Sequence, residues 1–287
     1  MQQRILGDLK VGSIGLGGMP MSIEGRPDEQ RSLATIHAAL DAGVTLIDTA
    51  DAYHLEAGEV GHNEQLIARA LRSWGGDPSG VVVATKGGHL RPGDGSWTLN
   101  GDPAYLKQAA RDSARRLGVD AIALYQFHRP DPDVPYAESV GALAELLDEG
   151  VIVRAGISNA TVAQIDEANE VLGGRLASVQ NQFSPAFRSS RGELEHCAEL
   201  GVAFLPWSPL GGISDAAELG SKHAAFAEVA QRYGVSPQQV ALAWELSLAQ
   251  VVIPIPGASR PSSIRDSVLA ADLRLTDDEL ARLDAPA

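Results

Sequence analysis

Short runs of apolar residues alternate with longer stretches of helical periodicity along the chain, and this alternation predicts repeated βα units. The chain opens on RILGDLKVG, which is typical of a β-hairpin. Strands are then expected at 13–16, 45–48, 81–85, 121–125, 153–158, 178–182, 203–206 and 251–254. Helices are expected at 28–42, 63–71, 103–117, 135–149, 162–172, 191–200 and 222–233, with further helices at 237–248, 261–270 and 277–283.

Glycine stands just past several of the predicted helices, as at Gly43, Gly118 and Gly201, where it adopts a left-handed cap without strain. Thr276 precedes Glu279 by three residues, which is the spacing of a capping box. No linker or change of composition divides the series. We therefore predict one domain, 1–287, with an α/β fold: a (β/α)8 TIM barrel with a short N-terminal β-hairpin and extra C-terminal helices. Catalytic residues of such barrels lie at the C-terminal ends of the strands.

Composition narrows the classes of protein. The chain has 287 residues, of which 44% are hydrophobic, and this is enough to form a full core. A net charge of −14 with no cluster of lysine and arginine argues against nucleic acid as a partner. Cys197 is the only cysteine, so neither a disulfide nor a thiolate metal site is expected, and a cytoplasmic protein is predicted. No apolar stretch approaches the ~18 residues of a membrane span. No obligate protein partner is evident.

Four chemically active side chains fall at the ends of predicted strands. Asp48 ends the second strand and Tyr53 follows it, Lys86 ends the third strand, and His128 follows the fourth. Each residue alone is commonly a solvated or packed side chain. In a barrel, neighbouring strand ends converge on one small volume, where an acid, a phenol, an ammonium and an imidazole shift one another's pKa. Together the four residues predict a catalytic site.

The segments around these residues resemble the aldo-keto reductase superfamily. DTADAY carries Asp48 and Tyr53, ATKGG carries Lys86, and QFHRPD carries His128, and these match the catalytic tetrad of that family. GISNA, VQNQFSP, LPWSPLGG and IPGASRP follow in the family's order, so the resemblance spans the chain. These segments are most similar to those of the short bacterial members of the family, which act on aldehydes such as pyridoxal. The resemblance implies reduction of small-molecule aldehydes or ketones to alcohols.

The resemblance also implies NADPH, or less often NADH, as cofactor, bound without a Rossmann domain. The glycine-rich segment 15–20 agrees, because proline stands where the third glycine of GxGxxG belongs. The residues implied to bind the cofactor are Gly18, Met19, Ser158, Asn159, Gln180, Trp207, Ser208, Leu210, Gly211, Gly257, Ser259 and Arg260. Arg260, beside a helix N-terminus that favours phosphate, is expected to meet the 2′-phosphate. Serine at 263 and 267, where many relatives carry arginine and asparagine, predicts a moderate preference for NADPH.

A reduced carbonyl needs a proton donor at its oxygen, and Tyr53 is expected to be that acid. Because a free tyrosine has a pKa of about 10, Lys86 is expected to lower the pKa, while Asp48 holds the ammonium in place. His128 is expected to orient the carbonyl oxygen. The side chains expected to wall the substrate pocket include His54, Trp97 and Arg129.

Other functions remain open from the sequence. A lysine at a strand end suits a Schiff base, which makes a class I aldolase acting through Lys86 the main alternative. A nicotinamide-binding regulatory subunit without turnover is another, because the family includes such subunits. Metal-dependent hydrolysis by His54, His62, His89 and His128 ranks low, since no HxH or HExxH pair supplies ligands, and no metal is expected.

Overall fold

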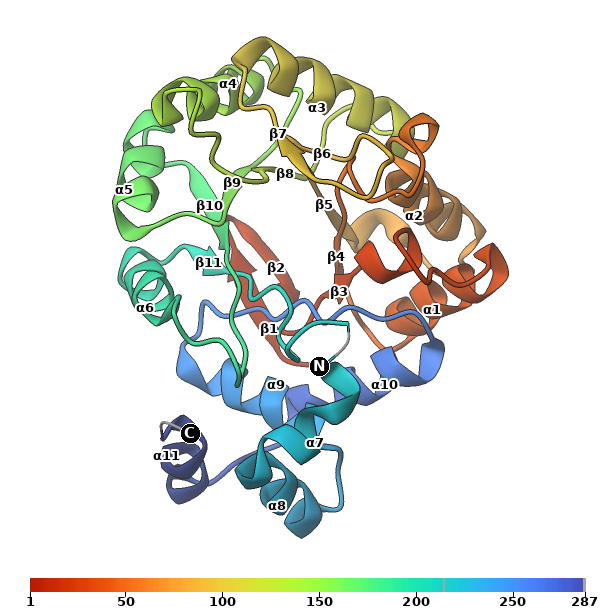
Figure 1. Cartoon of the computed structure of the whole chain (residues 1–287), viewed down its shortest axis with the longest axis vertical. Coiled ribbons are helices and arrows are strands. Elements are labelled where there is room, and N and C mark those ends of the chain that lie inside the picture. Colours follow the sequence, from red (N-terminus) through yellow and green to blue (C-terminus); the bar gives the residue numbers. More distant parts are fainter. Residues whose placement is uncertain (214, 286–287) are drawn as a thin grey trace.

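The computed structural model describes residues 1–213 and 215–285, and its strands form a curved parallel sheet inside a ring of helices (Figure 1). In chain order the strands are β3 (Leu16–Gly17), β4 (Leu46–Asp48), β5 (Val82–Gly87), β8 (Leu124–Phe127), β9 (Ala155–Ser158), β10 (Leu176–Gln180) and β11 (Ala203–Phe204). Neighbours in this order pair in parallel. The polar ends of all seven strands therefore meet at one end of the barrel.

The segment 251–257 closes the barrel between β11 and β3. Ile253 and Ile255 donate their N–H groups toward the β11 side. On the other side, the carbonyls of Pro254 and Pro256 accept from the N–H groups of Gly15 and Gly17, before and within β3, at 2.9 and 3.0 Å. Proline has no N–H, so this eighth strand cannot donate to its second neighbour and forms only isolated bridges. The prediction of a (β/α)8 barrel is confirmed, with its eighth strand in this reduced form.

The helices surround the sheet. They are α1 (Glu29–Asp41), α2 (His62–Ser73), α3 (Pro103–Leu117), α4 (Tyr136–Asp148), α5 (Val162–Val171), α6 (Arg191–Leu200), α7 (Leu219–Lys222), α8 (Ala224–Tyr233), α9 (Pro237–Leu248), α10 (Pro261–Leu269) and α11 (Asp277–Asp284). The capping box of Thr276 and Glu279 is present at the start of α11. The single helix expected at 222–233 is wrong at its start, because His223, at φ −130° and ψ 82°, is not helical and separates α7 from α8. Within the described residues, no helix is long and apolar enough to cross a membrane.

Several strands lie further along the chain, or are shorter, than the sequence predicts; the one expected at 13–16, for example, is Leu16–Gly17, and the one expected at 203–206 ends at Phe204. The strand expected at 121–125 runs from Leu124 to Phe127, and the one expected at 153–158 begins at Ala155. Gln126 ends the apolar run in the sequence, yet its side chain is fully buried and bonds Ser178 inside the barrel. The barrel interior is polar at the C-terminal ends of the strands. A prediction from hydrophobicity therefore ends this strand at 125, before the buried Gln126.

The hairpin of β1 (Gln3–Leu6) and β2 (Leu9–Gly12) closes the opposite end of the barrel. Leu6 and Val11 are completely buried and belong to one apolar cluster with residues such as Leu46 and Leu124, which lie early in their strands. Figure 1 shows the hairpin lying across the centre of the strand ring. This end is therefore a sealed apolar floor, and the open end is the one with the polar strand ends.

Replacing Leu6 by alanine should lower the free energy of unfolding by about 2 to 5 kcal/mol, because a buried leucine is removed from the floor. Ile5 is the matched control, since it lies on the other face of the same strand and is 51% exposed. Ile5→Ala should cost far less. Urea unfolding of both variants measures the difference, and equal losses would mean that the floor does not anchor the barrel.

Candidate active site

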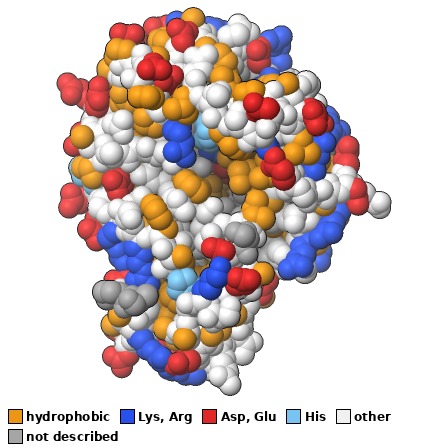
Figure 2. Space-filling model, in the orientation of Figure 1, with side chains coloured by type: hydrophobic (Ala, Val, Ile, Leu, Met, Phe, Trp, Pro, Cys, Tyr) orange, Lys and Arg blue, Asp and Glu red, His pale blue; other side chains and the backbone are white. Residues whose placement is uncertain are grey.

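A cavity of about 900 Å³ opens at the C-terminal end of the barrel. Figure 2 shows a hollow in the middle of this face, with hydrophobic side chains around much of its rim. The predicted site residues that line the cavity are Met19, Asp48, Tyr53, Trp97, His128, Arg129, Ser158, Asn159, Gln180, Trp207, Ser208, Leu210, Gly257, Ser259 and Arg260. Those that lie outside its lining are Gly18, His54, Lys86 and Gly211. Most of the predicted set is thus gathered in one place.

Lys86 joins the acid and the phenol of the predicted tetrad. Its Nζ donates to Asp48 Oδ2 at 2.7 Å, to Tyr53 Oη at 3.2 Å and to the Thr49 carbonyl at 2.9 Å. The ammonium is fully buried, with its charge balanced by the carboxylate. The other oxygen of Asp48 accepts from Gln180 at 2.8 Å. Three strand ends, those of β4, β5 and β10, thereby become one hydrogen-bonded unit.

Burial and neighbouring charges shift the pKa values of Tyr53 and Lys86. It raises the pKa of Tyr53 above its ordinary 10, and the opposing effect of Lys86 only partly offsets this. The expectation that Lys86 brings the pKa of Tyr53 below 10 is therefore wrong in net direction for the protein alone. Burial also disfavours the ammonium of Lys86, but Asp48 and Tyr53 more than compensate and its pKa is raised. At neutral pH the phenol keeps its proton and the lysine keeps its charge.

His128 lies beside Tyr53 in the cavity lining, with ring centroids 5.8 Å apart and ring planes nearly perpendicular, an edge-to-face contact. Burial holds its pKa well below 6.5, and the nearby Lys86, His89 and Arg129 add to this effect. The imidazole is therefore neutral, and a neutral imidazole both donates and accepts a hydrogen bond. His128 directly follows β8, and its N–H donates to the Gly87 carbonyl at 2.9 Å, so the pairing of β8 with β5 holds it at the strand end.

Two cavity residues have a left-handed backbone that glycine normally supplies: Asn159 at φ 58° and Ser208 at φ 50°. Asn159 is held there by its side-chain amide, which donates to the His128 carbonyl at 3.0 Å and to Ser158 Oγ at 2.9 Å. Such conformations cost about 1 to 3 kcal/mol and gather at functional sites. Asparagine adopts this region more readily than most residues, so it is chiefly at Ser208 that the sequence gives no signal of the strain.

The far end of the cavity is formed by the start of α10. Arg260 immediately precedes the helix, and its Nε donates to Ser263 Oγ at 2.7 Å. Ser262, Ser263 and Ser267 also line the cavity. Ile213, on the loop after β11, lines it as well and was not among the predicted residues, because nothing in its local sequence shows that this loop folds over the barrel mouth.

The short hairpin of β6 (His89–Leu90) and β7 (Thr98–Leu99) forms one wall. The ring of Trp97 stacks on His89 with centroids 4.6 Å apart, and the Arg91 guanidinium lies 5.0 Å from the Trp97 ring. The prediction that His54 walls the pocket is wrong. His54 is buried, with Nδ1 against the Glu56 carbonyl at 2.8 Å, and its own carbonyl accepts from Arg91 Nη1 at 2.6 Å.

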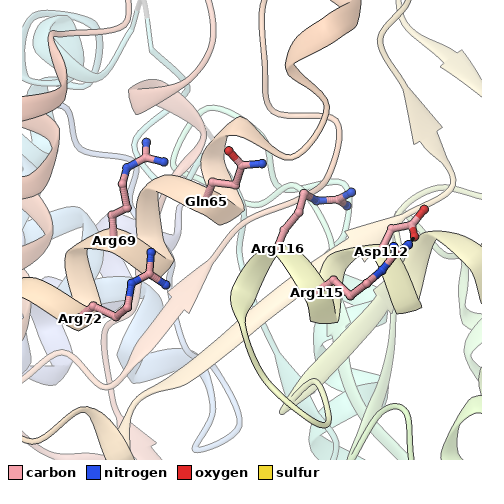
Figure 3. A pocket seen from close by; sticks show the side chains of 6 residues that line it. All are labelled: Gln65, Arg69, Arg72, Asp112, Arg115 and Arg116. Carbon is pink, nitrogen blue, oxygen red and sulfur yellow. Dashed lines mark ion pairs between the residues drawn. The ribbon is translucent and has the colours of Figure 1, made fainter.

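No group of three metal-binding side chains occurs among residues 1–213 and 215–285. A second hollow lies outside the barrel, between α2 and α3, and is lined by Gln65, Arg69, Arg72, Asp112, Arg115 and Arg116 (Figure 3). Arg69, Arg115 and Arg116 each pair with an acidic side chain, at Glu29, Asp112 and Glu64. These arginines are therefore largely neutralised by their neighbours, and the chemistry concentrates in the cavity at the strand ends.

The sequence model of the Aldo/keto reductase family matches residues 13–286. The chain belongs to the aldo/keto reductase family. This membership places it among oxidoreductases and agrees with the barrel and with the four gathered side chains. The resemblance inferred from DTADAY, ATKGG and QFHRPD is thus confirmed.

Known members of the aldo/keto reductase family match nearly the whole chain. An uncharacterized oxidoreductase of Schizosaccharomyces pombe is 35% identical over 97% of this chain and 88% of its own length. Pyridoxine 4-dehydrogenase of Escherichia coli is 31% identical over 97% of this chain and 96% of its own length. The crystal structure of an aldo/keto reductase from Klebsiella pneumoniae, in complex with NADP and acetate, is 27% identical with a TM-score of 0.82, covering 99% of this chain and 95% of that one.

This aldo/keto reductase has a second buried carboxyl, that of Asp51, which lies between Asp48 and Tyr53 in the sequence. Asp51 accepts a long hydrogen bond from Tyr105, at 3.5 Å, and its Oδ1 has no partner among the described residues. Burial, reinforced by the nearby Glu64 carboxylate and partly offset by Arg116, raises the pKa of Asp51 to about 8. The side chain is therefore mostly protonated at neutral pH.

The raised pKa of Asp51 makes the stability of the reductase depend on pH. The unfolded chain releases this proton near pH 4, whereas the folded protein holds it up to about pH 8. The free energy of unfolding should therefore fall as pH rises through this window, by at most ~1.4 kcal/mol per pH unit. Asp51→Asn, which resembles the protonated acid, should flatten this fall.

Urea unfolding at several pH values between about 5 and 8 measures the slope. Asp120→Asn is the matched control, since its carboxyl is exposed on the surface. The slope of this control should equal that of the unmodified protein. If Asp51→Asn leaves the slope unchanged as well, Asp51 is ionised in the folded protein.

Proposed function

We propose that this chain is an NADPH-dependent carbonyl reductase that converts aldehydes or ketones to alcohols. One observation carries the proposal: the protonated hydroxyl of Tyr53 faces the cavity while Lys86, charged and held by Asp48, stands 3.2 Å behind it. This arrangement supplies a proton at one point and stabilises the negative charge left behind. Membership of the aldo/keto reductase family supports the same reaction.

The cavity suits a dinucleotide. Its volume of about 900 Å³ is at the upper end for small-molecule sites and leaves room for a substrate beside the cofactor. Polar groups of Ser158, Asn159 and Gln180 lie near the tetrad and would hold the nicotinamide carboxamide, with the Trp207 ring against the nicotinamide. Arg260 and the N-terminus of α10 would take the 2′-phosphate. Other cavity residues proposed to contact the cofactor are Met19, Ser208, Leu210, Gly257 and Ser259.

When bound, NADPH supplies the hydride that reduces the carbonyl carbon. Tyr53 donates its proton to the carbonyl oxygen, and burial keeps that proton in place until negative charge develops on the oxygen. Lys86 then stabilises the phenolate, and Asp48 keeps the lysine charged. His128 is neutral, so its ring can donate a hydrogen bond to the same oxygen and fix its direction.

The aldolase alternative is less well supported. A Schiff base needs a neutral amine that the substrate reaches, but Lys86 is fully buried, does not line the cavity, and has a raised pKa. The alternative of a regulatory subunit differs from an enzyme only in lacking turnover. Because pyridoxine 4-dehydrogenase of Escherichia coli is a relative, pyridoxal belongs in the first panel of aldehydes to be tested.

Tyr53→Phe removes the proposed proton donor and keeps the ring. We expect kcat to fall by roughly 10²-fold or more, the range of general acid catalysis, with the Kd for NADPH nearly unchanged. Loss of reduced-nicotinamide absorbance measures turnover, and fluorescence titration measures cofactor binding. Near-normal turnover in this variant would remove Tyr53 from its proposed role.

Arg260→Ala tests the assignment of the 2′-phosphate. A charge-assisted hydrogen bond contributes about 1.5 to 3 kcal/mol, so NADPH binding should weaken by roughly 10- to 100-fold while NADH binding changes little. Arg265 on the same helix is exposed and lies outside the cavity lining, which makes Arg265→Ala the matched control. Equal losses for NADPH and NADH would show that Arg260 only supports the loop.

A further inference from the structure

Arg129 is a cation without a counter-ion in the catalytic half of the cavity. It follows His128 directly and lines the cavity. Its Nη2 donates to Asn159 Oδ1 at 3.3 Å, and its Nε is buried without a hydrogen-bond partner. No acidic side chain pairs with it among residues 1–213 and 215–285. A partly desolvated guanidinium in this state has donors to offer to a ligand.

The acidic residues of the cavity lining are all bound to other groups. Asp48 pairs with Lys86, and Glu24 pairs with Arg91. Asp266 accepts from Ser236 and from Gln239, each at 2.6 Å. These carboxylates therefore have partners of their own, and none of them neutralises Arg129.

Arg260, the other arginine of the lining, stands at the far end of the cavity, where the proposed function gives it the 2′-phosphate of the cofactor. Arg129 instead stands beside the residues that would surround the reacting carbonyl. A guanidinium presents paired N–H donors that match the two oxygens of a carboxylate or the oxygens of a phosphate. The two arginines of the lining thus lie in different parts of the cavity: Arg260 at the cofactor end and Arg129 at the substrate end.

We propose that Arg129 binds an anionic group of the substrate, so that the cavity selects carbonyl compounds that also carry a carboxylate or a phosphate. This inference rests on the proposed carbonyl reduction and adds a substrate class to it. Because Arg129 adjoins His128 in the chain, the anion would lie a short distance from the carbonyl oxygen. Binding the anion at Arg129 would then hold the carbonyl beside Tyr53.

Arg129 has one competing role, in the position of Asn159. Its hydrogen bond to Asn159 could serve only to orient that side-chain amide, which the proposed function places at the cofactor. In that case Arg129 would act through cofactor binding, and its loss would affect charged and neutral substrates alike. The charge of the substrate therefore separates the two roles.

The experiment compares 4-carboxybenzaldehyde with methyl 4-formylbenzoate, its neutral ester, at saturating NADPH. The unmodified protein should show a kcat/KM at least tenfold higher for the carboxylate. Arg129→Met should lower this value by roughly 10- to 100-fold, mainly through a higher KM, because the ion pair holds substrate and transition state alike. The value for the ester should change by no more than about twofold, and Arg129→Lys should restore part of the preference.

Arg72→Met is the matched control. Arg72 lies in the outer hollow between α2 and α3 (Figure 3), so its loss makes the same change in net charge without touching the cavity. The preference of the Arg72→Met variant for 4-carboxybenzaldehyde over the ester should equal that of the unmodified protein. Glyceraldehyde 3-phosphate against glyceraldehyde repeats the comparison for phosphate, and the larger effect of Arg129→Met identifies which anion the site prefers.

Equal losses for 4-carboxybenzaldehyde and its ester in Arg129→Met would overturn the proposal and assign Arg129 to Asn159. An equal kcat/KM for both compounds in the unmodified protein would overturn it too. If neither aldehyde nor any other carbonyl compound is reduced, the proposed function fails. Calorimetric measurement of 4-carboxybenzaldehyde binding then tests the anion site at Arg129 on its own. Weaker binding to Arg129→Met than to the unmodified protein supports the anion site, whereas equal binding refutes it.

Discussion

A fully buried ion pair governs the open end of this barrel. Lys86 and Asp48 carry opposite charges where water does not reach the ammonium, and removing either one would leave the other charge uncompensated in a low-dielectric interior. The neighbours must therefore supply the remaining hydrogen bonds. The Thr49 carbonyl, the Tyr53 hydroxyl and the Gln180 amide do so. The requirement to satisfy one buried charge thus fixes the position of the phenol and of an amide on a distant strand.

The interior of the barrel changes from apolar to polar along β4, β5 and β8. On β5 the inward positions are Val82, Ala84 and Lys86, spaced by the two-residue period of a strand. β4 passes from an apolar side chain to Asp48 over the same spacing, and β8 passes to Gln126. The sealed apolar half supplies hydrophobic burial, and the polar half meets the cavity. The inward positions of one strand, spaced by two residues, thus supply first the apolar core and then the polar side chains of the site.

The order of the elements and the gathering of the tetrad could be predicted because both depend on local patterns. Apolar runs mark the strands, and parallel strands in one barrel bring their last residues together. Features set by long-range packing could not be predicted. The burial of His54 under Arg91 and the upward net shift in the pKa of Tyr53 both depend on residues far away in the sequence, and so does the place of Ile213 in the cavity lining.

The two prolines of the closing strand also bear on association between molecules. In a strand, the N–H and C=O of one residue point to the same side, so Pro254 and Pro256 offer only acceptors toward β3. If the barrel opened at this seam, the freed edge would lack the donors that a foreign strand needs to build a ladder. The seam closed by Pro254 and Pro256 is therefore a poor template for edge-to-edge aggregation.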